Sequence, residues 1–311
     1  MLSEFNVIER FFSRPTSIKK ASTVLGIGDD CALLSIPDGY ELAITTDTMV
    51  EGVHFFAETN PECLGHKLLA VNLSDLASIG AKPMSVLLAL TLPSVNEKWL
   101  EAFAKGFFNL ADEFSVDLIG GDTTSGSLTL TVQALGLVAR GKSLLRSNAR
   151  VGDFIYVSGS LGNAGLGLLF LQGMTTIQSN VAIEQFNVPR PRVDLGLELS
   201  VFAHACIDIS DGLVGDLGHI LKQSQVGACI DWLALPLSDD VNAYIEQTGN
   251  WLMPLTAGDD YELCFTVPPE LDALVPQCCH KIGVIEERKG LRINRFGLIS
   301  DLVGKAYEHF S

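Results

Sequence analysis

Basic residues are scarce in this sequence. Lysine and arginine together number 21, against 37 aspartate and glutamate residues, which gives a formal net charge of −16. A surface that follows a nucleic-acid backbone needs basic side chains to neutralise phosphates, so this balance argues against a nucleic-acid partner. The acidic excess is compatible with a soluble surface or with a site whose carboxylates are filled by cations.

Long apolar runs and paired cysteines are also missing. No stretch approaches the ~18 apolar residues of a membrane-spanning helix, and residues 1–12 lack the basic start of a secretory signal. We therefore expect a cytoplasmic protein with no membrane partner. The seven cysteines are scattered without a CxxC pair, which argues against a zinc or dithiol redox site. We expect them to be reduced residues of the core.

The composition is that of a globular protein. Hydrophobic residues make up 47% and charged residues 19% of 311 residues, a length that favours two domains. Apolar spacing predicts a short helix before Pro15 and longer helices at 61–80 and 96–114. The runs VLGIGDDCALLSI (24–36) and ELAITTDTMV (41–50) predict strands, and alternation predicts a further strand at 128–138. The fold class expected from this mixture is α+β.

The pattern changes after Arg150, where VGDFIYVSGSLG predicts a new strand and a glycine turn. We place the domain boundary near residue 148, so that the domains are 1–148 and 149–311. In the second domain a helix is expected between the segment PRPRV and Ala205.

Residues 136–143 (GLVARGKS) satisfy the P-loop pattern of two glycines, lysine and serine. A P-loop leaves a strand at its first glycine and enters a helix at the lysine, so that backbone N–H groups surround phosphate. Here Leu137 and Val138 continue the strand alternation, and a new strand rather than a helix follows Lys142. We interpret the match as a coincidence of sequence.

Acidic residues stand beside glycine or hydroxyl residues in six separate segments. These are GIGDD (26–30), TTD (45–47), NLSDL (72–76), GGDTT (120–124), DISDG (208–212) and GDDYEL (258–263). Each alone is explained by a turn or a helix N-cap. Together they are expected to place oxygen ligands at the ends of several strands and on one helix, as a site for several cations requires.

The grouping of carboxylates predicts the kind of cation. Two close carboxylates repel by about 1 kcal/mol in water and about 4 kcal/mol at an effective dielectric constant near 20, so an empty cluster is costly. Oxygen ligands without paired His or Cys favour Mg²⁺ over zinc, and Mg²⁺ commonly bridges protein carboxylates to phosphate oxygens. The sequence therefore predicts phosphoryl chemistry on a nucleotide.

Six motifs together resemble the thiamine-monophosphate kinase family. In order they are GIGDDCALL, TTDTMVEGVHF, NLSDLASIGAKP, GGDTT, IDISDGLVGDL and GDDYELCF, and they cover nearly the whole chain. This family belongs to the aminoimidazole ribonucleotide synthetase-like superfamily, with selenophosphate synthetase and a hydrogenase maturation factor. GDD and DxSDG are shared across much of that superfamily, whereas TTDTMVEGVHF, NLSDLASIGAKP and the closing KAYEHF are closer to the kinase.

The resemblance implies a fold and an activity. The fold is the two-domain α+β fold of the superfamily, with an N-terminal domain that forms a β-sheet or barrel and a C-terminal α+β domain. The activity is ATP-dependent phosphorylation of thiamine monophosphate to thiamine diphosphate, by direct in-line transfer assisted by several Mg²⁺ ions. The partners are the two small-molecule substrates and, through the N-terminal strands, a second copy in a homodimer.

The resemblance also implies roles for individual residues. Implied Mg²⁺ ligands are Asp30, Thr45, Thr46, Asp47, Asp75, Asp122, Asp208 and Asp211, of which Asp47, Asp75 and Asp122 act in catalysis through the metal. Implied ATP contacts are Gly121, Asp122, Arg146 and Ser210. Implied contacts to thiamine phosphate are His54, Glu262 and Tyr307.

Structural alternatives remain open for the last two groups. Arg146 fits a bidentate phosphate contact or a solvated loop, and a single His such as His54 is often structural. Glu262 fits a cation-binding carboxylate or a turn residue. Tyr307 fits a ring contact or core packing, and it lies between Ala306 and Glu308 where the family usually has Gly and Asp.

Two other functions fit the same motifs. One is an enzyme of the same superfamily that transfers phosphate from ATP to a different acceptor. The other is a non-catalytic dimer that binds divalent cations, although retention of the mutually repelling Asp47, Asp75 and Asp122 argues against it.

Overall fold

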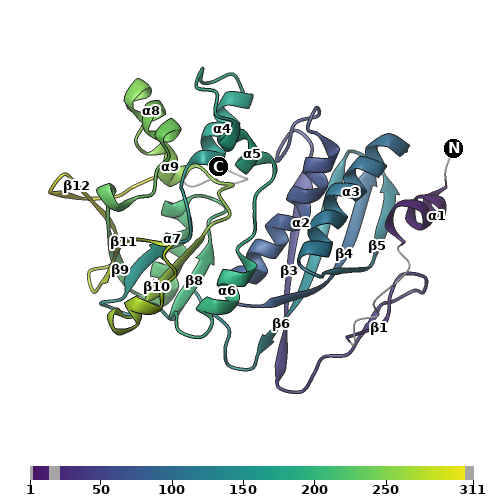
Figure 1. Ribbon diagram of the computed structural model, residues 1–311, viewed down its shortest axis with the longest axis horizontal. Coiled ribbons are helices and arrows are strands. Elements are labelled where there is room, and N and C mark those ends of the chain that lie inside the picture. Colours follow the sequence, from purple (N-terminus) through teal and green to yellow (C-terminus); the bar gives the residue numbers. More distant parts are fainter. Residues whose placement is uncertain (1–2, 14–21, 305–311) are drawn as a thin grey trace. The chain divides into compact units, whose positions relative to one another are not determined.

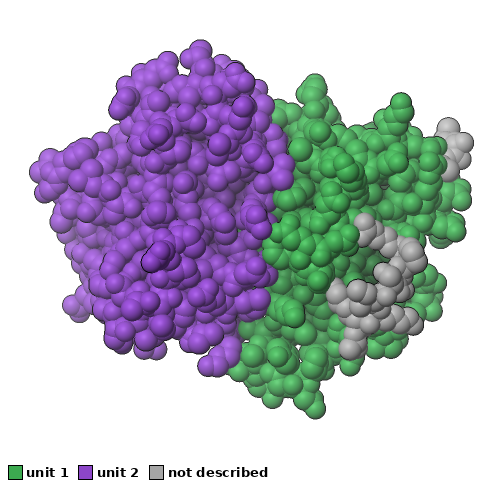
Figure 2. Space-filling model, in the orientation of Figure 1, with its two compact units in different colours: residues 1–76, 81–141 green, residues 77–80, 142–311 purple. Residues whose placement is uncertain are grey.

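The computed structural model describes residues 3–13 and 22–304. The chain groups into two compact units, one of residues 1–76 and 81–141 and the other of residues 77–80 and 142–311 (Figure 2). The boundary that we place near residue 148 falls in the segment 140–153, which contains neither helix nor strand.

The first unit is a four-stranded sheet with two long helices on one face (Figure 1). Its helical elements are α1 (Glu4–Val7), the π-helical turn η1 (Ile8–Phe12), α2 (Pro61–Ser78) and α3 (Glu97–Glu113). Its strands are β1 (Thr23–Leu25), β2 (Leu33–Leu34), β3 (Tyr40–Val50), β4 (Lys82–Leu92), β5 (Asp117–Ser125) and β6 (Thr129–Ala139). The sheet order is β3-β6-β4-β5, and β1 and β2 form a separate pair.

Alternation over the first half of β6 explains why that part of the sheet has one buried face. On β6, Leu130, Val132 and Ala134 are fully buried, whereas the residues between them are partly exposed. The predicted helices at 61–80 and 96–114 are present as α2 and α3. Their backbones approach closely, since a β-carbon at Gly106 would lie only 1.8 Å from the carbonyl oxygen of Glu62.

Two predictions for local structure were wrong. The run VLGIGDDCALLSI forms only the short strands β1 and β2, because the intervening loop contains Gly28 at φ 120° and two aspartates, which disfavour strand structure. The helix expected to reach Ala205 is α6, which ends at Leu199.

The second unit contains a seven-stranded mixed sheet of order β13-β12-β9-β11-β7-β10-β8. Its strands are β7 (Phe154–Val157), β8 (Ala205–Asp208), β9 (Gly227–Asp231), β10 (Leu263–Val267), β11 (His280–Glu286), β12 (Gly290–Arg295) and β13 (Leu298–Asp301). Its helices are α4 (Asn163–Leu171), α5 (Asn180–Asn187), α6 (Val193–Leu199), α7 (Leu213–Ser224), α8 (Asp239–Thr248) and α9 (Met253–Thr256), with 3₁₀ turns η2 (Trp232–Ala234) and η3 (Pro269–Leu274).

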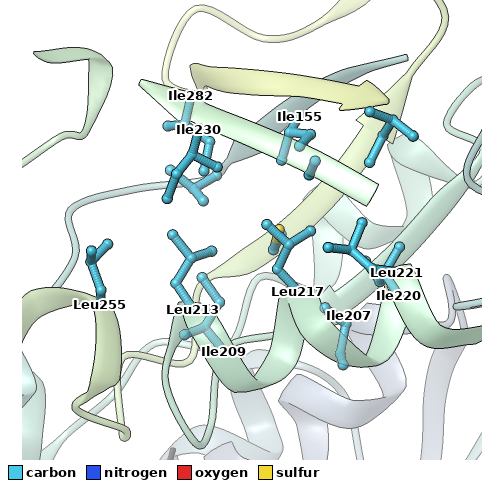
Figure 3. Packing of buried hydrophobic residues seen from close by; sticks show 14 of the residues in the cluster. Ile155, Ile207, Ile209, Leu213, Leu217, Ile220, Leu221, Ile230, Leu255 and Ile282 are labelled. Carbon is cyan, nitrogen blue, oxygen red and sulfur yellow. The ribbon is translucent and has the colours of Figure 1, made fainter. Parts of the chain in front are cut away.

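Helix α7 supplies one side of the main core of this unit. Its apolar side chains point toward isoleucines of the sheet: Leu213, Leu217, Ile220 and Leu221 face Ile155, Ile230 and Ile282 (Figure 3). This packing fixes the start of α7, which directly follows the DISDG segment.

The cysteines depart in part from expectation. Cys206 and Cys264 are buried in strands of the second unit as predicted, but Cys31 and Cys278 are exposed. Within the described ranges, no helix is both long enough and apolar enough to cross a bilayer.

Candidate functional site

Strand β3 and helix α2 bring four polar side chains together. Thr45 and Asp47 alternate onto the helix-covered face of β3, and the Thr45 hydroxyl donates a hydrogen bond to the carboxylate of Asp75 on α2. The main-chain N–H of Asp47 donates to Oδ1 of Asn72 at 3.2 Å. Asn72 and Asp75 are adjacent on one face of the helix, so the two strand residues meet two helix residues.

Asn72 is held rigidly in this group. It is fully buried, and its Nδ2 donates to the carbonyl oxygen of Leu68 at 3.0 Å, one turn earlier on α2. Asp47 and Asp75 are only half-buried. The arrangement therefore presents carboxylate oxygens at a partly solvated position while fixing the backbone that carries them.

Thr46 lies differently from its neighbours. Its hydroxyl accepts a hydrogen bond from Nε2 of Gln133 at 3.3 Å on the opposite face of the sheet. The side chain of Thr46 is thus not grouped with those of Thr45 and Asp47. The expectation that the acidic residues lie at strand ends was also too simple, since Asp47 lies within β3 and Asp122 within β5, and only Asp208 ends its strand.

Gly121 and Asp122 occupy the other edge of the sheet. Two strands, β6 and β4, separate β5 from β3, so Asp122 lies roughly 14 Å across the sheet from Asp47. Gly121 has φ 149°, and a β-carbon there would lie 1.8 Å from the carbonyl oxygen of Leu88. Any other residue at 121 would push β5 away from β4.

Asp30 belongs to the β5 side of this unit. The loop that carries it starts beside β5, because Thr23 donates to Asp117 at 3.5 Å and a β-carbon at Gly26 would lie 4.0 Å from the carbonyl oxygen of Ile119. Asp30 itself is exposed. The first unit therefore has two groups of predicted ligands, one at each edge of its sheet.

His54 lies in a tight turn that follows β3. Its Nδ1 accepts a hydrogen bond from the main-chain N–H of Val50 at 3.0 Å. Because a backbone N–H can only donate, the neutral imidazole carries its proton on Nε2. The turn thus sets the tautomer and makes Nε2 a hydrogen-bond donor.

In the second unit, the DISDG and GDDYEL segments pack against each other through their backbones. The N–H of Asp259 donates to the carbonyl oxygen of Ser210 at 2.9 Å, and the N–H of Tyr261 donates to that of Ile209 at 2.8 Å. A β-carbon at Gly258 would lie 2.2 Å from the Ser210 oxygen. The two motifs are therefore parts of one structure.

Within this structure the three predicted residues of DISDG differ in exposure. Asp208 ends β8 and is 3% exposed, whereas Ser210 and Asp211 in the following turn are partly exposed. Arg146 is exposed and lies in the segment between β6 and β7. These residues provide carboxylate, hydroxyl and guanidinium groups in one unit.

Asp216, to which the sequence analysis gave no role, contacts this turn. Its Oδ2 accepts a hydrogen bond from the N–H of Asp211 at 3.0 Å, and the charge of Arg146 acts on it. Burial raises the pKa of Asp216 to about 7. The available signal was its position on the apolar stripe of α7, between Leu213 and Leu217, where a carboxylate needs a specific reason.

Asp260 caps a helix. Its carboxylate accepts hydrogen bonds from the N–H groups of Gly162 at 2.8 Å and Ala164 at 3.3 Å, at the start of α4. Burial raises its pKa to about 8, although these two hydrogen bonds act in the opposite direction. The GDD motif therefore supports the glycine turn before α4.

Glu262 is held in a buried ion pair. Nε of Arg192 donates to its Oε2 at 2.8 Å, a second guanidinium N–H reaches Oε1, and the Ser158 hydroxyl also donates to Oε2. The Glu262 side chain is only 3% exposed, whereas that of Arg192 is 32% exposed. Arg192 was missed in the sequence because it lies 70 residues away, in PRPRV.

Two other sequence predictions have simple outcomes. Tyr307 lies outside the described residues. The P-loop match fails as predicted, because β6 continues through Gly136 to Ala139 and residues 140–153, all described, form no helix after Lys142.

The donor types fit Mg²⁺ better than a softer metal. The β3–α2 group consists of carboxylate, hydroxyl and amide oxygens, which are hard ligands. Within residues 3–13 and 22–304, no three His, Cys, Asp or Glu side chains converge on one metal position. An ion here would have few protein ligands and would complete its shell with water or phosphate oxygens, which is the usual Mg²⁺ arrangement.

Comparison with known proteins identifies the family. The N-terminal domain of AIR synthase related proteins matches residues 28–138, and the C-terminal domain of the same family matches residues 150–294. The thiamine-monophosphate kinase of Haemophilus influenzae is 46% identical over 301 residues, covering 93% of this chain and 91% of that protein. The chain belongs to the thiamine-monophosphate kinase family.

Solved structures of this kinase family agree in fold. The crystal structure of thiamine-monophosphate kinase from Stenotrophomonas maltophilia K279a matches with a TM-score of 0.82 at 44% identity, covering 89% of this chain and 92% of that one. A structure described as AaThiL complexed with AMPPCP and TMP matches with a TM-score of 0.80 at 30% identity, covering 89% of each chain. The predicted kinase family, α+β fold and enzyme class are confirmed.

Proposed function

We propose that this protein phosphorylates thiamine monophosphate to thiamine diphosphate with ATP as the phosphate donor. The observation that carries the proposal is the 46% identity to a thiamine-monophosphate kinase over almost the whole of both chains. The relative bound to AMPPCP and TMP supports the same pair of substrates. The reaction contributes to the biosynthesis of thiamine diphosphate.

The proposed step is direct in-line transfer. An oxygen of the acceptor phosphate forms a bond to the γ-phosphorus while the bond to the β–γ bridging oxygen breaks, so that ADP leaves. This chemistry needs positioning and charge neutralisation more than a strong protein base. The oxygen-rich groups around Asp75 and Asp211 are suited to that requirement.

Several Mg²⁺ ions would neutralise the phosphate charges when bound. We assign their ligands to the first unit at Asp30, Thr45, Thr46, Asp47, Asp75 and Asp122, and to the second unit at Asp208 and Asp211. For Thr46 the main-chain oxygen is the candidate, because its hydroxyl lies with Gln133. The catalytic contribution of Asp47, Asp75 and Asp122 would be to hold metal.

Nucleotide contacts are assigned to Gly121, Asp122, Arg146 and Ser210. Arg146 is suited to bidentate binding of phosphate, and Ser210 provides a hydroxyl beside Asp211. For the acceptor we assign His54, Glu262 and Tyr307, with the Nε2 proton of His54 donated to phosphate. Direct contact of Glu262 with a cationic thiamine ring would exchange the Arg192 guanidinium for that ring.

We propose that the protein is a cytoplasmic homodimer. The face of β3 turned away from α2 exposes Leu42 at 36% and Ile44 at 57%, and Thr48 joins Thr131 there. Exposed branched residues in a row on one sheet face favour pairing with a second apolar surface. A second copy, related by two-fold symmetry, supplies that surface and makes the sheets into a barrel-like assembly.

The decisive experiment follows the acceptor. The purified protein is incubated with ATP, Mg²⁺ and thiamine monophosphate, with free thiamine as a parallel acceptor, and the products are separated by chromatography. Thiamine diphosphate formed from the monophosphate only, and lost on chelation, is expected. If no diphosphate forms while Mg²⁺-dependent ATP binding persists, the acceptor is a different one of the superfamily and the proposal is wrong.

A further inference from the structure

The carboxylate of Asp216 lies beneath the turn that carries the predicted nucleotide and metal residues of the second unit. Asp216 is 3% exposed and is located in the first turns of α7. Its own N–H donates to the carbonyl oxygen of Gly212 at 3.0 Å, as in a regular helix. The main chain of Asp216 thus makes the ordinary helical hydrogen bond, while its side chain contacts the turn that precedes the helix.

The backbone of that turn contacts Asp216. The Asp211 N–H donates to Oδ2 at 3.0 Å, and the neighbouring Ser210 N–H also acts on the carboxylate, lowering its pKa. Hydrogen bonds to a charged acceptor are stronger and more directional than those between neutral groups. They orient the peptide planes from which the Ser210 hydroxyl and the Asp211 carboxylate project.

Arg146 is joined to the same helix through its main chain and interacts with it through its charge. Its charge acts on the Asp216 carboxylate, and its main-chain oxygen accepts a hydrogen bond from the hydroxyl of Ser224 at 2.8 Å, at the end of α7. The Ser224 hydroxyl also accepts from the N–H of Ala149 at 3.1 Å. Helix α7 thus fixes the path of the segment that carries Arg146.

An apolar residue would pack better at position 216. The neighbours of Asp216 on the buried stripe are Leu213, Leu217 and Ile220, and burying a carboxylate there costs free energy unless its hydrogen bonds compensate. The N–H of Asp211 and the charge of Arg146 offset only part of this cost, since burial still raises the pKa of Asp216 to about 7. A carboxylate at this buried position therefore indicates a role in positioning the turn and Arg146.

We propose that Asp216 is a positioning residue for nucleotide and metal binding, acting through Ser210, Asp211 and Arg146. The inference rests on the proposed function, because it takes these three residues as contacts to Mg²⁺ and ATP. Asp216 itself touches neither ligand. Its effect is to hold the ligand-bearing turn in one conformation and to restrain the arginine beside it.

The test compares Asp216→Ala and Asp216→Asn with a matched control, Asp153→Asn. Asp153 is an equally buried aspartate of the same unit, and it accepts the Arg150 N–H at 2.9 Å and contacts His204. Binding of ATP with Mn²⁺ is measured by titration calorimetry and by the electron paramagnetic resonance of free Mn²⁺. Circular dichroism defines a temperature at which every variant is folded.

Loss of a group that orients metal ligands typically costs about 10- to 100-fold in affinity, and we expect that loss for Asp216→Ala. Asp216→Asn keeps an oxygen acceptor for the turn but loses the charge beside Arg146, so its loss is expected to be less than about tenfold. Asp153→Asn is expected to change thermal stability but not ligand affinity. In turnover, the KM for ATP should rise more than kcat falls.

The opposite result is equally clear. If folded Asp216→Ala binds Mn²⁺ and ATP as tightly as the unaltered protein, or if Asp153→Asn weakens binding to the same degree, Asp216 has only a structural role. The binding assay contains no acceptor. If the unaltered protein binds ATP but makes no thiamine diphosphate, the proposed function is wrong, but the binding data still decide the role of Asp216. If the unaltered protein binds no nucleotide, both the proposed function and the positioning role are wrong.

Discussion

The hydroxyl of Thr45 donates a hydrogen bond to the carboxylate of Asp75, which joins strand β3 to helix α2. Asp47, two residues further along the strand, is joined to the same helix through Asn72. The pair of contacts brings two acidic residues 28 positions apart in the sequence to the same strand–helix contact. Asp75 takes part through its carboxylate, whereas Asp47 takes part through its main-chain N–H.

Asp75→Ala should lower thiamine diphosphate formation by more than about 100-fold, because it removes a carboxylate that we propose holds metal at the phosphoryl-transfer site. Thr45→Val removes one hydrogen bond and a hydroxyl that we propose as a metal ligand, but it leaves that carboxylate, so a smaller loss is expected. Initial rates at saturating ATP and Mg²⁺ provide the measurement. Glu62→Ala serves as the control, because Glu62 lies on α2 like Asp75 but only forms an exposed ion pair with Lys105 of α3. The rate of this variant should stay near that of the unaltered protein.

Lys142→Ala should have almost no effect. The lysine follows the end of β6 in a segment without helix, so it lacks the setting of a P-loop lysine. A surface substitution of this kind usually changes folding stability by no more than about 0.5 kcal/mol. We expect the free energy of ATP binding, measured by calorimetry, to change by no more than the same amount, which is roughly a twofold change in affinity. A loss comparable with that of Asp75→Ala would reinstate the P-loop interpretation.

Arg192→Ala should destabilise the second unit by about 3 kcal/mol, because it leaves the Glu262 carboxylate buried without its cation. Urea denaturation followed by tryptophan fluorescence measures the change. The matched control is Arg288→Ala, which breaks an exposed pair with Asp301 at 3.6 Å and should cost less than about 1 kcal/mol. Equal effects of the two substitutions would mean that the buried pair is no more important than a surface one.

Asp260 predicts a pH dependence of stability. Its pKa in the folded protein is about 8, above its ordinary value of 3.8, so the folded state holds a proton that the unfolded state releases. Its contribution to the free energy of unfolding is therefore fully present below pH 3.8 and is lost as the pH rises to about 8.

Asp260→Asn removes this titration while keeping an oxygen that can accept from Gly162 or Ala164. We expect the stability of the variant to fall less than that of the unaltered protein between pH 5 and pH 8, by at least about 1 kcal/mol. Urea midpoints at a series of pH values test this. Parallel curves for the two proteins would show that Asp260 titrates in the ordinary acidic range.

Ile44→Lys tests the proposed dimer. The side chain is 57% exposed on the outer face of β3, so a charge there should be tolerated by the isolated subunit but not within an apolar interface. Light scattering coupled to size-exclusion chromatography should give a dimer for the unaltered protein and a monomer for the variant. A variant that elutes as a dimer would place the interface elsewhere.

The longer elements could be predicted from the sequence because their signals are local. Pro61 begins α2, and the alternation of β6 identifies its buried face. The segment around GIGDD could not be predicted in the same way, because its branched residues suggest strands whereas Gly28 and the following aspartates favour a loop. The start of that segment also contacts a residue far away in sequence, since Thr23 donates a hydrogen bond to Asp117.

The sequence predicts Asp47, Asp75 and Asp211 as cation ligands from residue type and context, and that prediction awaits the metal-binding experiments above. The structure adds which of these residues lie near one another, since Asp47 and Asp75 meet where β3 contacts α2. Arg192 and Asp216 were not predicted, since their significance depends on what they contact. No local pattern relates PRPRV to Glu262, and the side chain of Asp216 matters because of the backbone of a turn rather than because of a motif of its own.

The close approach of Gly258 to the carbonyl oxygen of Ser210 limits how this protein can be redesigned. If the DISDG turn were grafted onto another scaffold without the GDD turn, it would lose its conformation, since the two backbones pack against and hydrogen-bond to each other. The smallest transplantable unit is therefore discontinuous in sequence, and a fragment that ends before residue 258 should fail to reproduce the turn.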